Sequence, residues 1–446
     1  MRLSVDPGFA RAEQCTGVRD LKRPSFRLPT FAENNRGYFQ VIAAIPAAFG
    51  SALSVLLVLS DIWAIISLCL GRYRLRYLRS DMFVVVPAIL YIIVMDASIL
   101  SRAHGWADIG LAMMPMIYIT IPLLIARCRV TPEVDYFTVF VRAAPLCGIL
   151  LCPIMAYQVW EGVARVNSFA GNAFPFAMIC AILGPTALLN LSARASRGMV
   201  IYALAGFLSC AAGLILSETR TVWFVFAVNL VVLAWFFGPR ISIRKNWLVV
   251  PFVAVVLIGV VAGFHHRVEK RVGMLVGDFH ALWDDKVPDP SMSIRLGLWR
   301  GGFEAARKHP FVGYGANNRR AIIRSIPIEF SNGPNQPPRT GSVNVSTFHN
   351  GFLTAMIDAG VFGVLVTLML LVSPVLLAVF SPRDDLFRDR MAFTLFLFFT
   401  YAITGEVNIM FGQDLIDALF IMGCLVVALS VGTGPRIHQD PVAGKR

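Results

Sequence analysis

Charged residues are scarce in this sequence. Only 15% of its 446 residues are Asp, Glu, Lys or Arg, whereas 57% are hydrophobic. A soluble globular protein carries about 25% charged residues, so the composition excludes an ordinary soluble enzyme. Apolar runs long enough to span a bilayer recur along the chain. We therefore expect an all-α polytopic membrane protein in which one helical bundle takes up most of the sequence.

Motifs for metal binding and disulfide formation are also missing. The eight cysteines contain no CxxC pair, and none lies between residues 265 and 348, the longest hydrophilic segment after the N-terminus. Five of the seven histidines lie between residues 265 and 349, but none shows HxxxH or HExxH spacing, and Asp284-Asp285 is not a DxD motif. We therefore expect no zinc site, no disulfide framework and no metal or other cofactor.

The net charge of +13 does not indicate a nucleic-acid partner, because the sequence contains no soluble basic domain. In a membrane protein, basic residues first report which connections face the cytoplasm. Residues 1–36 are polar and lack the short apolar core of a signal peptide, so we expect them to form a cytoplasmic tail.

The apolar segments predict about 12 transmembrane helices. These segments lie near residues 39–71, 82–98, 110–126, 137–158, 170–190, 199–216, 221–237, 247–264, 350–373, 391–405 and 414–431. The first segment is too long for one span, and Pro46, Gly50 and Asp61 interrupt it. We therefore expect two crossings there; a single crossing, which gives eleven helices, is the alternative.

Arginine and lysine in the connections set the expected orientation. The connections that carry them are 72–79, 126–129, 192–197, 238–245 and 381–390. Because basic connections stay in the cytoplasm, the external connections are 99–109, 159–169, 217–220, 265–349 and 406–413. The expected organisation is a cytoplasmic tail at 1–36, helices 1–9 within 37–264, a large, partly helical external loop at 265–348, helices 10–12 within 349–431 and a cytoplasmic tail at 432–446.

The external loop 265–348 is unusually basic, with twelve basic and seven acidic residues and a net charge of +5. Long loops cross the membrane largely regardless of charge. The charge therefore suits either a solvated loop near anionic headgroups or a site for a phosphorylated substrate, whose oxygens match guanidinium groups. Within the loop, residues 292–309 have helical spacing that Gly301 and Gly302 weaken, and "SNGPNQPPRTGS" (331–342) has the composition of an irregular loop.

Two residues stand at the external boundary of apolar segments. Arg220 falls in the first turn of an expected helix, where its charge opposes the helix dipole; it either snorkels to the interface or pairs with a carboxylate or a phosphate. His349 precedes an apolar run in "STFHNGFL" (346–353). It is either a cap or interface residue, or the side chain that takes a proton from a hydroxyl near neutral pH.

Three fragments of the sequence resemble the O-antigen ligase/polymerase family of bacterial membrane glycosyltransferases. They are "LSETRTVW" (216–223), "SIRLGLWRGGFEAARKHPFVGYG" (293–315) and "STFHNGFLTAMIDAGVFG" (346–363). The resemblance covers roughly residues 200 to 430 and includes the large external loop between two late transmembrane helices. Each fragment alone is loose, but their order on one side of the membrane is fairly specific to the family.

The resemblance implies a function and a set of site residues. It implies a metal-independent, inverting transfer of a glycan from undecaprenyl diphosphate at the periplasmic face of the bacterial inner membrane. The implied residues are His349 as the essential histidine, Arg220 and Arg295 as the diphosphate-binding arginines, and Glu218, Arg300, Asn350 and Asp358 in supporting positions. Nearby arginine should keep the imidazole of His349 neutral, because like charge lowers its pKa.

Two alternatives stay open at this stage. A membrane transporter of lipid-linked glycan or another anion would suit twelve helices, but transporters place ionisable residues near the midplane and often show repeated halves, so the external charges favour an enzyme. A ligase passes the glycan to a lipid A-core acceptor, whereas a polymerase passes it to another lipid-linked glycan. Both use the same donor, and we favour the ligase-related function only slightly.

Overall fold

The computed structural model describes residues 29–45, 51–103, 105–191, 195–237, 290–330 and 339–432, together with isolated positions between 269 and 283. The predictions for residues 1–28, for the basic connection 238–245 and for the apolar segment 247–264 lie outside the described residues.

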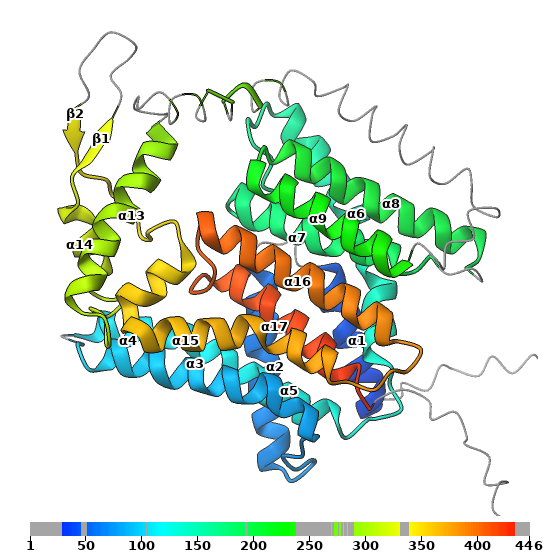
Figure 1. Cartoon of the computed structure of the whole chain (residues 1–446). Helices are drawn as coiled ribbons and strands as arrows, with labels where there is room; N and C mark the ends of the chain where they lie inside the picture. The colour runs from blue at the N-terminus through cyan, green and yellow to red at the C-terminus, as the bar shows by residue number, and fades with distance from the viewer. Residues whose placement is uncertain are drawn as a thin grey trace, which may run out of the picture.

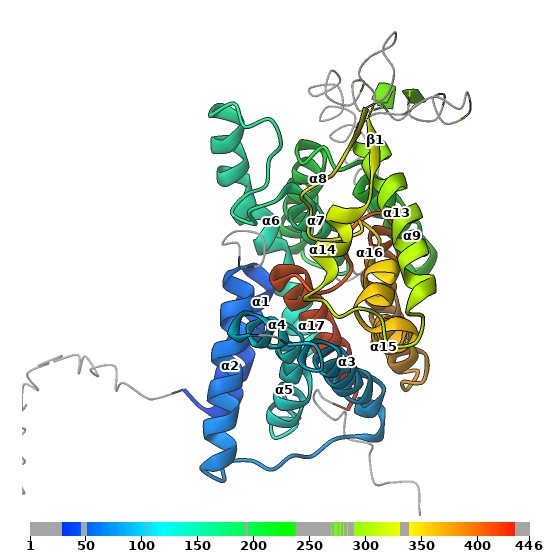
Figure 2. The same ribbon diagram turned by 90° about the vertical axis from the view of Figure 1, so that its left-hand side faces the viewer.

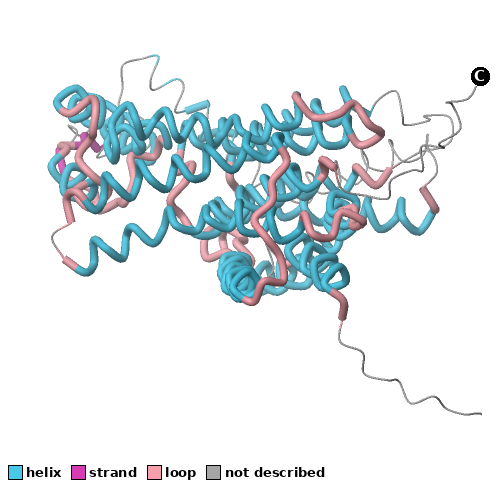
Figure 3. Tube along the Cα trace, turned by 90° about the horizontal axis from the view of Figure 1, so that it is seen from below, coloured by secondary structure: helices cyan, strands magenta, loops and turns pink. Residues whose placement is uncertain are grey.

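The described chain is almost entirely helical (Figures 1 and 3). In chain order the helices are α1 (Phe31–Ala44), α2 (Ala52–Cys69), α3 (Met82–Leu100), α4 (Trp106–Met116), α5 (Thr120–Cys128), α6 (Tyr136–Trp160), α7 (Ala173–Leu188), α8 (Arg197–Leu216), α9 (Arg220–Phe237), α13 (Pro290–Lys308), α14 (Arg319–Ser325), α15 (Gly351–Val379), α16 (Phe387–Val407) and α17 (Asp414–Leu429). One short antiparallel hairpin pairs β1 (Ile328–Phe330) with β2 (Arg339–Gly341).

Six helical segments in the described part of the chain are long and apolar enough to cross a membrane. They are α2, α3 with the turn before it (Arg79–Leu100), the α4–α5 segment (Trp106–Cys128), α6, α8 and α15. The helices α7 and α9 are apolar but shorter. The predicted class, a helical membrane protein, is therefore confirmed, whereas the number twelve stays a prediction.

The connections between helices gather at two ends of the bundle. At one end, Arg129 binds Asp81 (2.5 Å) and the carbonyl of Ala428 (2.9 Å), and Arg390 binds Asp384 (3.0 Å) and the carbonyl of Ser430 (3.1 Å). We call this the basic end. At the basic end, three of the connections that were predicted to face the cytoplasm lie next to the end of α17.

The opposite end carries α13, α14 and the hairpin, and we call it the loop end (Figure 1, left; Figure 2). Arg102, just after α3, donates to the carbonyls of Val312 (3.3 Å) and Gly313 (3.1 Å) in the external segment. Asn350, just before α15, donates to Glu406 near the end of α16 (3.1 Å). Connections predicted to share one side of the membrane therefore do lie together.

Two boundaries differ from the sequence-based expectation. The helix α1 begins at Phe31, inside the predicted tail, because Thr30 and Glu33 form a capping box: the Thr30 hydroxyl accepts from the Glu33 amide (3.2 Å) and the Glu33 carboxylate from the Thr30 amide (2.7 Å). The expected loop 331–342 contains β2 at residues 339–341, which pairs with Ile328–Phe330; strand pairing across a loop is not visible in local composition.

The helix α15 is two half-helices joined at a break. Ala359 and Gly360 have non-helical backbone angles, and Gly360 has φ +63° and ψ −152°. Residues 309–315, which we call the clasp, fill the break: the amides of Tyr314 and Gly315 donate to the carbonyls of Ile357 (2.6 Å) and Asp358 (2.9 Å), and the amide of Val361 donates to Pro310 (2.8 Å). The clasp thus satisfies backbone groups that a broken helix would leave unpaired.

Glycines make this close approach feasible. Gly313 and Gly315 have φ of +60° and +85°, in the left-handed region that favours glycine. A Cβ added to Gly313 would lie 2.5 Å from the carbonyl oxygen of Ile357. The "HPFVGYG" and "DAGVFG" stretches are therefore two halves of one backbone contact.

Candidate active site

His349 sits in a constrained backbone position at the loop end. Its φ is +51°, in the left-handed region that non-glycine residues seldom adopt. On one side, Phe348 is fully buried, and its carbonyl accepts a hydrogen bond from the Trp299 indole (3.1 Å). On the other side, Asn350 caps α15 by accepting from the amide of Leu353 (2.9 Å). Both neighbours are fixed, so the strained conformation is held in place.

The hydrogen bonds of His349 define its tautomer. Its Nδ1 lies 3.3 Å from Oδ1 of Asn408, and the same Oδ1 accepts from the backbone amide of Ile409 (3.0 Å). An atom that accepts from an amide is an oxygen, so Nδ1 of His349 must be the donor. The Nε2 atom then carries the lone pair and can accept a proton.

The surroundings of His349 keep the imidazole neutral. Burial is the largest influence and lowers its pKa below the usual 6.5, and the positive charge of Arg295 lowers it further. The hydrogen bond with Asn408 acts in the opposite direction and offsets part of this effect. The result is an imidazole that is free to act as a base at neutral pH.

The helix α13 brings Arg295 beside His349. Arg295 is one helical turn before Trp299, so the two side chains share a face of the helix, and Trp299 binds the residue preceding His349. Gly302 permits this approach, since a Cβ there would lie 2.8 Å from both Phe348 and Leu353. The two glycines that weakened the helix prediction therefore serve packing, and α13 is continuous through them. Arg300 is exposed on the same helix.

Arg220 is placed at the same end by the packing of α9 against α16. The side chain of Asn229 on α9 donates to Thr400 on α16 (3.2 Å). The two helices are antiparallel. About 12–13 Å of α9 lies between this contact and Arg220, and about the same length of α16 lies between the contact and Asn408. Arg220 and the partner of His349 therefore stand at the same height in the bundle.

The turn before Arg220 contains a further arginine contact. Arg165 donates to the carbonyl of Ser217 (3.0 Å) and to the hydroxyl of Thr219 (3.1 Å). Between them, Glu218 is half-buried and has φ +53°. Arg165 was not singled out from the sequence, where it is one basic residue in an external connection with no motif around it.

Asp358 lies away from His349 and has a different setting. The residue is 3% exposed, and its carboxylate binds Arg319 at 2.5 Å. Its backbone carbonyl accepts from Ser98 of α3 and from Gly315 of the clasp. Nine residues of chain separate Asp358 from His349, which is about 13 Å along a helix. In the structure Asp358 lies at the break in α15, and its supporting role at the site stays a prediction.

A groove of about 510 Å³ opens beside Asn350 and Glu406. Its remaining lining residues come from α13, the clasp and α15, and apart from Arg307 they are apolar: Phe303, Ala306, Pro310, Phe352, Leu353, Met356 and Val364. The groove therefore places apolar surface next to the helix cap that follows His349. Within the described residues, no group of three His, Cys, Asp or Glu side chains could hold a metal ion.

A comparison with known protein families finds a match for the part of the chain that contains this site. The family model described as O-Antigen ligase matches residues 204–368, from α8 to the second half of α15, and the match contains Arg220, Arg295 and His349. No curated protein matches the chain. The match supports the O-antigen ligase/polymerase family for residues 204–368 of this multi-pass membrane protein.

Proposed function

We propose that the protein transfers a glycan from undecaprenyl diphosphate to a hydroxyl acceptor, with lipid A-core as the acceptor of a ligase. The observation that carries the proposal is a half-buried, neutral imidazole with Arg295 close by and an apolar groove alongside. In this proposal the loop end faces the periplasm and the basic end faces the cytoplasm, as basic connections favour. The match to the O-Antigen ligase model supports the reaction class.

The proposed reaction uses the chain's own residues throughout. Nε2 of His349 takes the proton of the acceptor hydroxyl as its oxygen attacks the anomeric carbon of the donor sugar. The bond between that carbon and the diphosphate oxygen breaks, and the configuration inverts. Arg220 and Arg295 stabilise the negative charge on the departing diphosphate. The apolar groove beside Asn350 would hold the first part of the lipid chain.

A reconstituted assay tests the proposal against transport. Purified protein in detergent is mixed with lipid-linked donor and with either lipid A-core or a second lipid-linked glycan. Formation of a new glycosidic linkage without any sealed vesicle supports an enzyme, and the acceptor that is consumed tells a ligase from a polymerase. Absence of product with both acceptors, combined with donor movement in proteoliposomes, would instead support a transporter.

Arg295→Gln should change the pH dependence of the transfer. The active form has a neutral imidazole, so kcat/KM falls as the pH falls through the pKa of His349, which in the wild type is below 6.5. Removing the like charge of Arg295 raises that pKa, so the acidic limb moves to higher pH, toward about 6.5. A pH profile from about 4.5 to 8.5, which spans the usual His pKa of about 6.5, measures the shift.

Arg320→Gln on α14 is the matched control, since Arg320 is exposed and its loss removes the same charge from the same external segment. Its acidic limb should coincide with that of the wild type. An acidic limb that stays in place in Arg295→Gln, or that moves to lower pH, contradicts the assignment of His349 as the base.

A further inference from the structure

The exposed apolar face of α15 is confined to the part of the helix that follows its break. Large apolar side chains are exposed from Phe362 to Phe380, among them Leu365 and Leu368. In residues 351–360, all of which the structure describes, no side chain is exposed. A continuous apolar surface on a membrane helix faces acyl chains, so the contact of α15 with lipid begins just after the break.

The part of α15 after the break matches the thickness of a bilayer. Residues 361–379 form about 28 Å of helix, and the hydrocarbon core of a bilayer is about 30 Å thick. The helix α3, which is 19 residues long, lies alongside (Figure 1). The rings of Phe83 and Phe380 stack at the basic end (5.4 Å between centroids), and Ser98 donates to the carbonyl of Asp358 at the loop end. Both helices therefore have the same span, and the break in α15 falls at its loop-end edge.

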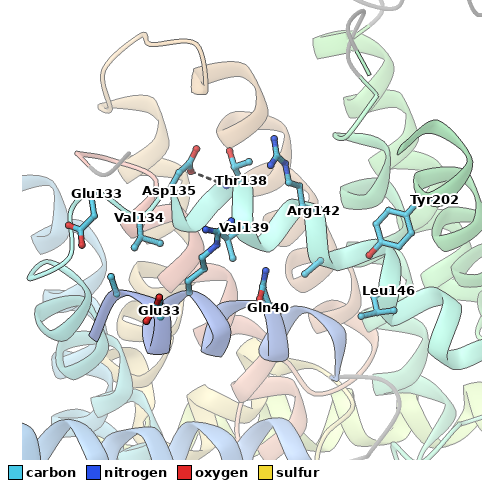
Figure 4. Close-up of a pocket in the computed structure, with 13 residues that line it drawn as sticks. Glu33, Gln40, Glu133, Val134, Asp135, Thr138, Val139, Arg142, Leu146 and Tyr202 are labelled. Carbon is cyan, nitrogen blue, oxygen red and sulfur yellow. Dashed lines mark hydrogen bonds between the residues drawn. The ribbon is translucent and has the colours of Figure 1, made fainter. Parts of the chain in front are cut away.

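Carboxylates mark the other edge of this span. The starts of α1 and α6 meet at the basic end, where the side chain of Asn35 binds Thr131 (3.1 Å). The groove between these helices is lined by Glu33, Glu133 and Asp135, together with arginines (Figure 4). Carboxylates avoid the hydrocarbon core of a membrane. The basic end is therefore one edge of the hydrocarbon, and the break in α15 marks the other.

The clasp lies at the break and carries exposed apolar side chains. Phe311 is 67% exposed and Val312 is 53% exposed. Their backbone packs against Gly360: a Cβ added there would lie 2.2 Å from the Phe311 carbonyl and 2.5 Å from the Val312 nitrogen. The exposed face of α15 begins two residues later, at Phe362. Neither Phe311 nor Val312 lines the groove beside Asn350, so the pair continues the apolar face of α15 rather than that groove.

The end of α3 carries residue types that are typical of a membrane interface. Arg102, just after α3, donates to the carbonyls of Val312 and Gly313 in the clasp. Trp106, the first residue of α4, is 87% exposed. Tryptophan is enriched where hydrocarbon meets headgroups, and arginine places its charge in the same layer. The connection that binds the clasp therefore has the composition expected at the edge of the bilayer.

We propose that the clasp is a membrane anchor. Phe311 and Val312 insert among the acyl chains of the leaflet at the loop end, and they hold the external segment against the bilayer surface. A second copy of the chain and the lipid of a substrate are the other candidate occupants of this surface. Bulk lipid is favoured because the lipid-facing side of α15 begins two residues after Gly360, against which the clasp packs. The anchor needs no glycan substrate, so it is independent of the proposed transfer reaction.

Photo-crosslinking of the full chain in nanodiscs of phosphatidylethanolamine and phosphatidylglycerol tests the proposal. The photoreactive amino acid p-benzoylphenylalanine replaces one residue at a time: Phe311, Val312, Phe362 or Arg324. Phe362 lies on the apolar face of α15 and is the positive control, whereas Arg324 is exposed near the end of α14 and is the control within the external segment. We expect phospholipid adducts in similar yield at Phe311, Val312 and Phe362, and loss of the adduct at Arg324, as measured by mass spectrometry.

Three results would overturn the proposal. Adducts at Phe362 without adducts at Phe311 and Val312 would place the clasp in water. Cross-linking of Phe311 to a second copy of the chain, in place of lipid, would indicate an interface between copies. Adducts at the clasp that form only after lipid-linked donor is added would indicate a substrate site. Thermal unfolding in detergent checks the fold of each substituted protein, and we expect the wild-type temperature at Phe311 and Val312 because both side chains are exposed.

Discussion

His349→Asn is expected to abolish glycan transfer while the protein still folds. Asn is the non-glycine residue best suited to the left-handed backbone found at this position, where φ is +51°. It keeps a polar side chain facing Asn408 but cannot take a proton from the acceptor hydroxyl. The loss of a general base typically lowers a rate by about 10²–10⁴-fold. The measurement is kcat for linkage formation by purified protein, together with thermal unfolding.

The control for this variant is His280→Asn, since His280 is exposed and belongs to the same external segment. It should transfer glycan at the wild-type rate. His349→Gly offers a sharper version, because glycine accepts the backbone angle and leaves room for added imidazole, which should restore part of the activity with a pH dependence of its own. Full activity of His349→Asn at normal expression would show that another group accepts the proton.

Gly360→Ala is expected to prevent the break in α15 from forming. The angles of Gly360, φ +63° and ψ −152°, lie in a region that is essentially restricted to glycine. A Cβ at this position would lie 2.2 Å from the carbonyl carbon and oxygen of Phe311, which are backbone atoms of the clasp. The backbone strain alone costs about 1–3 kcal/mol, and the clash forces the clasp out of the break. We expect little folded protein, seen as loss of the monodisperse peak and of the thermal transition in detergent.

Gly110→Ala is the matched control within the helical bundle. Gly110 lies in α4, and a Cβ added there would meet nothing within 4 Å. Helix propensity favours alanine over glycine by about 1 kcal/mol, so this variant should unfold at the same or a slightly higher temperature. If Gly360→Ala unfolded at the wild-type temperature, the break in α15 would not depend on the glycine.

The class of fold could be predicted from the sequence, and so could several of the residues that lie together at the loop end. Scarce charge and repeated apolar runs indicate membrane helices. The side on which each connection is expected then follows from the order of basic and other connections along the chain. This is why His349, Arg295 and Arg220 were expected on one side. A cap such as Asn350 depends only on residues within one helical turn, so local sequence is enough to indicate it.

The partners of the site residues could not be predicted, because they depend on contacts far apart in the chain. Asn408, which defines the tautomer of His349, is 59 residues away from it and carries no motif. Arg319 is one of twelve basic residues in the external loop, and only the fold selects it to neutralise Asp358. For the same reason the sequence did not show that the backbone carbonyl of Asp358 accepts hydrogen bonds from the clasp and from α3.

The clasp has a consequence for exchanging parts between related proteins. Its backbone hydrogen bonds join residues 309–315 to residues 357–361, so a membrane helix and an external segment share one hydrogen-bond ladder. A chimera that takes the external loop from one parent and α15 from another combines a clasp and a helix break from different proteins, and their backbones need not match. Crossover points before α13 and after Gly363 keep the ladder within one parent, and such chimeras should be the ones that assemble.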